Sequence, residues 1–180
     1  MAKISDIQQE IINSIQTGFN ENEFLAIFGN TTAPQVRPNV PYVSIKYDDM
    51  QVQGSKPYIK YANTSTDGVL NETVVDTVNL TFSCNFYRGE AFDNALLAQQ
   101  ILRKSVTQEY LSTVDSTYTD VSNIKDYTVP VGTSYEHRAW FTLTVSSCIS
   151  YEDEIPTLDS LSINGKAIMP EVTEYITLEV

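Results

Sequence analysis

Two long stretches of strict two-residue alternation constrain the fold of this chain more than any other feature. In residues 77–87 an unbroken series of apolar side chains falls on one face, and in residues 139–151 most of the apolar side chains do so again, with Trp140 and Cys148 on the opposite face. They are Val78, Leu80, Phe82, Cys84 and Phe86 in the first stretch and Phe141, Leu143, Val145, Ile149 and Tyr151 in the second. Since successive side chains of a strand point to opposite sides of a sheet, each stretch predicts a strand with one buried face. We expect the two strands to be central, antiparallel members of one sheet.

Two other segments have the periodicity of helices. Isoleucines at positions 4, 7, 11, 12 and 15 share one face, which predicts an amphipathic helix that stops near Gly18. A second helix is expected from Glu90 to about Lys104, with acidic residues at its start and basic residues at its end, as the helix dipole favours. Its alanine-rich stripe favours close packing on a sheet. The expected fold class is therefore α+β: a mixed, mainly antiparallel sheet with helices packed on one face, plus a β-rich C-terminal extension.

Shorter patterns account for the rest of the main domain. We expect a short helix at residues 21–28, a loop with three prolines at 31–41 and a half-buried strand at 42–47. A strand at 58–61, an exposed loop at 63–68 and a strand at 121–127 are also expected. Residues 105–119 are interpreted as a helix end followed by a polar connection.

Pro156 marks the predicted boundary between a domain at residues 1–155 and a C-terminal β extension or arm at 156–180. Asn164–Gly165 favours a hairpin turn within residues 161–168, and residues 172–180 are expected to form a last strand. The extension has few large apolar residues, so it needs a surface to lie on. It either folds back on its own domain, over Trp140, or pairs as an arm with a sheet edge of a neighbouring subunit or tail component.

The charge and the cysteines exclude several classes of protein. A net charge of -12 disfavours binding of nucleic acid through its phosphates, which needs Lys and Arg. The acidity either keeps the chain soluble or forms a wall past which DNA slides. Cys84 and Cys148 have no metal-ligand spacing, and the alternation places them on opposite sides of the sheet, so we expect free thiols in a reducing cytoplasm. We expect no signal peptide and no membrane span.

The sequence offers little material for catalysis. His137 is the one histidine, and no nucleophile elbow or glycine-rich phosphate loop is present. We interpret the run Glu152–Asp153–Glu154 as a solvated strand end, because it lacks the spacing of a calcium loop. We therefore expect no enzyme, no cofactor and no metal site.

The order of the segments and two short motifs carry a resemblance to a known family. The stretch Phe86-Tyr87-Arg88-Gly89-Glu90-Ala91 leads from a strand into the alanine-rich helix, and Glu136-His137-Arg138-Ala139 opens the last long strand. Together with Pro41–Ile45, these features resemble the phage neck and tail-terminator family over residues 41–151. The resemblance implies a homo-oligomeric ring, commonly a hexamer, without catalytic residues. Such a ring caps the tail tube and joins it to the head connector or stopper protein. It also implies a virion protein of the tail or neck that is assembled in the host cytoplasm.

Candidate surfaces follow from this resemblance. Trp140, Arg138, Tyr58 and Tyr61 are the candidate interface residues, because large aromatic groups are enriched in interfaces. A ring through which DNA passes without specific binding needs a neutral or acidic lumen, for which Asp48, Asp49, Asp115 and Asp120 are the candidates. Other readings remain open. The chain is alternatively another connector component, such as a stopper or head-completion protein, or a receptor- or carbohydrate-binding module that uses Tyr58 and Tyr61.

Overall fold

The computed structural model describes residues 3–20, 22–29, 37–63, 69–132, 134–156, 165–168 and 173–176. The chain divides into two compact units, one made of Met1–Pro57 and Asp76–Ser150, the other of Tyr58–Val75 and Tyr151–Val180. The helices are α1 (Ile4–Gln16), α2 (Ala91–Leu102) and α3 (Ser105–Ser112). The strands are β1 (Leu25–Phe28), β2 (Tyr42–Asn63), β3 (Val69–Tyr87), β4 (Ser116–Val121), β5 (Lys125–Asp126), β6 (Val129–Val131), β7 (Ser134–Glu136), β8 (Arg138–Pro156), β9 (Gly165–Ile168) and β10 (Thr173–Ile176).

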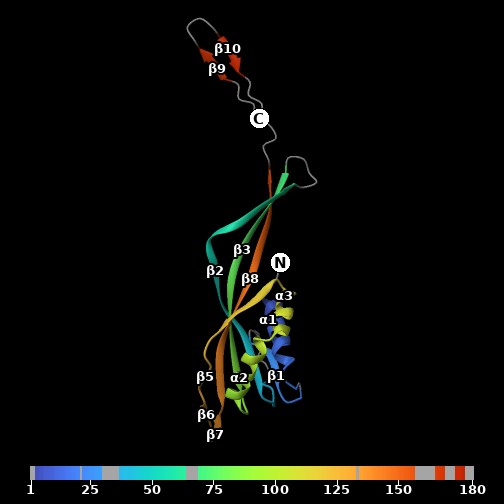
Figure 1. Ribbon diagram of the computed structural model, residues 1–180. Helices are drawn as coiled ribbons and strands as arrows, with labels where there is room; N and C mark the ends of the chain where they lie inside the picture. Colours follow the sequence, from blue (N-terminus) through green and yellow to red (C-terminus); the bar gives the residue numbers. More distant parts are fainter. Residues whose placement is uncertain are drawn as a thin grey trace. The chain divides into compact units, whose positions relative to one another are not determined.

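One mixed sheet has the strand order β1-β2-β3-β8-β4, and β5 also pairs with β8. β1 runs parallel to β2, whereas β4 and β5 run antiparallel to β8. The amide of Arg88, directly after β3, donates a 3.1 Å hydrogen bond to the carbonyl of His137, directly before β8. The end of β3 therefore lies beside the start of β8, and the two central strands are antiparallel (Figure 1). This confirms the expected arrangement.

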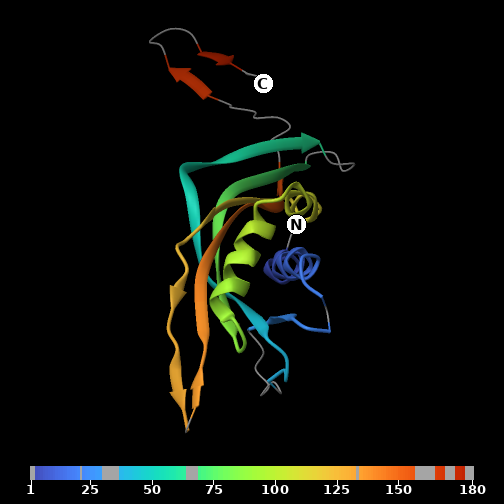
Figure 2. The same cartoon turned by 60° about the horizontal axis from the view of Figure 1, so that its bottom comes forward.

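The core of the first unit lies between one face of this sheet and the helices. All three helices cover the same face (Figure 2). The predicted alternation is confirmed for Val78, Leu80, Phe82, Cys84 and Phe86 of β3 and for Phe141, Leu143 and Val145 of β8, all of which are buried. It is wrong for Tyr151, which is 60% exposed, and Ile149 is only partly buried, because this end of β8 extends beyond the layer of helices. Burial of these apolar groups against the isoleucines of α1 and the alanines of α2 is the main force that stabilises this unit. The α+β class is confirmed.

Gly18 has a different role from the one predicted. α1 ends at Gln16 and is capped by Thr17 in a right-handed helical conformation, so no left-handed glycine terminates it. A Cβ atom at Gly18 would instead lie 2.0 Å from Cδ1 of Ile101. The glycine is therefore needed because the chain after α1 passes directly against α2.

The structure overturns the expected helix at residues 21–28. Leu25–Phe28 form β1 and pair in parallel with Tyr42–Ile45. The side-chain amide of Gln16 fixes the start of this strand, since it donates to the carbonyl of Phe24 at 3.1 Å and accepts from the amide of Ala26 at 2.9 Å. A short apolar run has no period that separates helix from strand, so these long-range bonds decide its conformation.

Three other expectations need correction. Residues 105–119 form a separate helix, α3, and most of a strand, β4, rather than a helix end and a polar connection. The strand expected at 121–127 is wrong in position, because β4 ends at Val121 and β5 covers only Lys125–Asp126. The strands expected at 42–47 and 58–61 are parts of one long strand, β2.

The second unit contains the remaining parts of β2, β3 and β8 and the antiparallel pair β9–β10. Gly165 begins β9 and pairs with Ile176 of β10, which lies within the last strand expected at residues 172–180. The hairpin turn expected at Asn164–Gly165 stays a prediction. Asn164 lies outside the described residues. The division of the chain at residue 155 stays a prediction.

Candidate assembly surfaces

Arg138 is held in a cluster of aromatic rings at the end of the central strands. Its guanidinium forms an ion pair with Glu136, to which Nε donates at 2.8 Å, and lies 5.5 Å from the ring centre of Tyr87. Tyr87 stacks on Tyr42 with ring centres 4.9 Å apart. Burial raises the pKa of Tyr87, and the hydrogen bond to Glu136 raises the pKa of Arg138. The guanidinium of Arg138 is therefore already paired with a carboxylate of its own chain.

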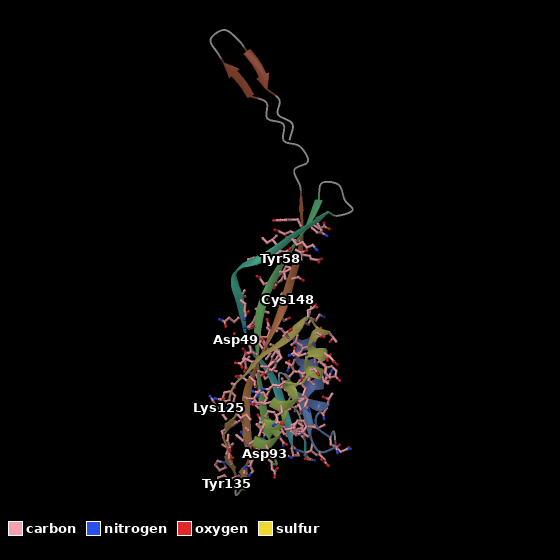
Figure 3. The ribbon with its side chains drawn as sticks, viewed as in Figure 1. Asp49, Tyr58, Asp93, Lys125, Tyr135 and Cys148 are labelled. Atoms are coloured by element: carbon pink, nitrogen blue, oxygen red, sulfur yellow. The ribbon has the colours of Figure 1, made fainter. Side chains whose placement is uncertain are left out.

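Trp140 lies two residues further along β8, on the face of the sheet opposite the helices, and is half-buried. Lys125 of β5 pairs with it across the strands and places its Nζ 4.7 Å from the ring centre. Figure 3 labels Lys125 on this edge of the sheet. One side of the indole is thus covered by the chain's own cation, at a distance typical of a cation–π contact. A contact of Trp140 with a second subunit stays a prediction.

Tyr58 and Tyr61 belong to the second unit, so the structure does not assign the four candidate interface residues to one cluster. Both side chains are exposed, Tyr58 by 68% and Tyr61 by 55%. The Tyr61 hydroxyl donates to Oε1 of Glu72 at 3.1 Å, and this bond raises the pKa of Tyr61. The two rings are available to a partner.

The four candidate lumen residues lie at two opposite edges of the sheet. Asp48 and Asp49 follow the part of β2 that pairs with β1, whereas Asp115 and Asp120 lie before and within β4. Asp48 pairs with Lys46 at 3.5 Å and accepts a bond from Ser83, and Asp49 accepts from the amide of Met50 at 2.8 Å. Asp115 occupies a turn with a φ of 49°. These carboxylates are exposed but do not form one acidic patch.

Sequence reasoning missed an exposed surface on the helical layer, which we call the α2–α3 face. It consists of Phe92, Leu96, Leu97, Arg103, Lys104 and Val106, all of which are exposed. The apolar members are between 39% and 45% exposed. Phe92 and Leu96 are four residues apart and so share one side of α2. Their spacing is a signal in the sequence, but it does not tell which side of the helix meets the sheet.

His137 lines a pocket of about 210 Å³ at the start of α2, together with Glu90, Asp93, Asp126 and Arg138 among others. Its Nδ1 atom lies 3.5 Å from the hydroxyl of Thr128. Figure 3 labels Asp93 on α2, at this end of the helix. Within the part of the chain that the structure describes, no three His, Cys, Asp or Glu side chains come together as metal ligands. None of the helices described is both long and apolar enough to cross a membrane.

A model of the family described as phage neck terminator protein matches residues 5–169. The chain belongs to this family. It is therefore a structural bacteriophage protein of the neck terminator family. The resemblance noted in the sequence is confirmed.

No curated protein matches the chain. Among solved structures, the chain is similar to the sheath/tube terminator of an extracellular contractile injection system, PVC, in its extended state, with a TM-score of 0.43 and 14% sequence identity. The match covers 94% of this chain and 65% of that one. The chain thus spans just under two thirds of the length of that terminator.

Proposed function

We propose that the chain forms a homo-oligomeric ring, a hexamer, that caps the tail tube and joins it to the head connector or stopper protein. The family match over residues 5–169 carries this proposal. Two surfaces support it. In the described part of the chain the helices lie on one face of the sheet, and the α2–α3 face exposes four large apolar side chains to water. Exposed apolar groups that lie close together are typical of protein contacts.

The acidity of the chain fits a ring around DNA. With a net charge of -12, a ring of such subunits repels phosphates and does not retain the passing duplex. We propose Asp48, Asp49, Asp115 and Asp120 as lumen residues and Arg138, Trp140, Tyr58 and Tyr61 as contact residues. Assembly takes place in the host cytoplasm, and the protein acts without catalysis or cofactor.

A phage that lacks the gene for this protein tests the proposal. We expect DNA-filled heads and separate tails of abnormal length, because an uncapped tube has no defined end and no joining surface. A plasmid copy of the wild-type protein restores joined particles, and a copy with His137→Ala restores them equally well. Normal joined virions without the protein would disprove the proposal.

The same lysates separate this function from that of another connector component. A terminator is expected to co-purify with free tails, whereas a stopper or head-completion protein co-purifies with DNA-filled heads. Negative-stain microscopy of the tail fraction then shows whether a ring caps the tube. Recovery of the protein only in the head fraction favours the stopper alternative.

The exposed rings of Tyr58 and Tyr61 favour a second candidate, a receptor- or carbohydrate-binding module. Replacement of both by Ser separates the two functions. If the protein is a terminator, the phage either fails to join heads to tails or yields joined virions that adsorb to the host as fast as the wild type. If the protein is a binding module, the phage yields joined virions that adsorb slowly.

A further inference from the structure

The α2–α3 face combines apolar and basic groups in a way that is unusual for this chain. Arg103 and Lys104 are the one adjacent pair of basic residues in an otherwise acidic sequence. Both are exposed and follow directly after α2, two helical turns beyond Leu96 and Leu97, or about 10 Å along the helix axis. In the described part of the chain the ion pairs join Lys46 to Asp48 and Arg138 to Glu136, so neither Arg103 nor Lys104 has a carboxylate partner there.

The end of β8 has the complementary composition. Glu152–Asp153–Glu154 is the one run of three acidic residues in the sequence, and it follows Tyr151, which is 60% exposed. All four side chains are exposed. Because side chains alternate along a strand, Tyr151 and Asp153 lie on one face about 6–7 Å apart, and Glu152 and Glu154 lie on the other. Each face of this strand end therefore presents carboxylates, and one face adds an aromatic ring.

We propose that the α2–α3 face of one copy binds the acidic end of β8, Tyr151–Glu154, of a second copy. Tyr151 packs on Phe92 and Leu96, and the carboxylates pair with Arg103 and Lys104. Charge complementarity decides the occupant, since the longest acidic run and the one basic pair belong to the same sequence. This inference rests on the proposed function, because it assigns the contact between subunits of the ring.

The contact is head-to-tail, because it joins two different surfaces. A head-to-tail contact repeated around an axis closes into a ring, whereas a contact of one patch with itself stops at a dimer. Each subunit then donates one strand end and receives another. Without the contact, the apolar members of the α2–α3 face stay in water, as they do in the single chain.

Charge reversal in the phage that lacks the gene tests the inference. The face variant carries Arg103→Glu with Lys104→Glu, and the strand-end variant carries Asp153→Lys with Glu154→Lys. We expect each variant alone to lower the yield of joined virions at least tenfold, because like charges then meet at every contact. Co-expression of the two variants restores the yield, since in an alternating hexamer every contact again joins opposite charges.

Matched controls separate the contact from loss of folding or of net charge. Lys3→Glu with Arg37→Glu makes the same charge change as the face variant at two exposed positions elsewhere, and we expect full yield. Each purified variant should melt within a few degrees of the wild type. A yield that stays high with either single variant overturns the inference. A second result also overturns it: a single chain with all four changes restores the yield, but co-expression of the two variants does not. That result would place the contact within one chain. Neither outcome affects the proposed function, which is tested separately by the phage that lacks the gene and by the fraction with which the protein co-purifies.

Discussion

Phe82 is the residue on which the assignment of the buried sheet face depends most directly. Its ring is fully buried in the C-terminal half of β3 and meets the ring of Tyr47 edge-on, with the ring centres 5.9 Å apart. Phe82→Ala removes the ring and leaves a cavity, so we expect a loss of about 3–5 kcal/mol in the free energy of unfolding. Urea unfolding measures the change. Val52→Ala is the control, because Val52 is 53% exposed and should lose less than about 0.5 kcal/mol. A loss below about 1 kcal/mol for Phe82→Ala would assign this face to solvent.

The two cysteines give a second prediction at the residue scale. Both are free, Cys84 in the core and Cys148 on the exposed face. Burial, and then the nearby charge of Asp48, raise the pKa of Cys84, so its reactive thiolate is not formed at neutral pH. We expect one thiol to react rapidly with a maleimide in the native protein and two in denaturant, with or without prior reduction. Cys148→Ser should abolish the rapid reaction, whereas two rapid thiols in the native state would contradict the structure.

At the scale of elements, the side chain of Gln16 joins α1 to β1. It bonds the carbonyl of Phe24 and the amide of Ala26, which are the groups at the start of the strand. Gln16→Ala leaves both groups without this partner, so we expect a loss of about 1–3 kcal/mol. In the Gln16→Ala variant, the backbone amides of residues 24–28 should exchange their hydrogens faster than those of β3. Gln9→Ala is the matched control, because Gln9 bonds only Asn13 within its own helix. Equal exchange rates in the two variants would show that Gln16 does not hold the strand.

The elements that the sequence predicts well are those whose conformation is decided locally. Phe82 and Phe141 stand in long alternating stretches, and the isoleucines of α1 repeat with a helical period, so both patterns appear without knowledge of neighbours. β1 was missed because its four apolar residues have no period, and their conformation depends on Gln16 and on pairing with β2. The order of strands is likewise not local. For this reason the sequence did not show that Asp48 and Asp120 lie at opposite edges of the sheet.

At the scale of the whole molecule, the charge predicts weak interaction with DNA. The excess of twelve acidic groups leaves few cations to displace the counterions of a duplex. We expect no binding of the isolated protein to duplex DNA at micromolar concentration and 150 mM salt in a mobility-shift assay. Asp48→Lys with Asp49→Lys and Asp115→Lys with Asp120→Lys are a matched pair of variants, one for each edge of the sheet. Tight, salt-sensitive binding by the wild type would contradict a lumen that lets DNA pass.

Truncation after Pro156 separates the two roles that are open for the C-terminal segment. In the part of the chain that the structure describes, every buried apolar side chain lies between Ile7 and Val145, and β9 pairs with β10. We propose that the segment acts as an arm that pairs with a neighbouring subunit or tail component. The truncated protein is then expected to unfold cooperatively and to lose less than about 1 kcal/mol, which is a shift of roughly 2–4 °C in Tm. The truncated protein should also fail to restore joined virions. Removal of residues 177–180 alone is the control for a changed C-terminus. A fall in Tm of more than about 10 °C would show that the segment belongs to the core of its own chain.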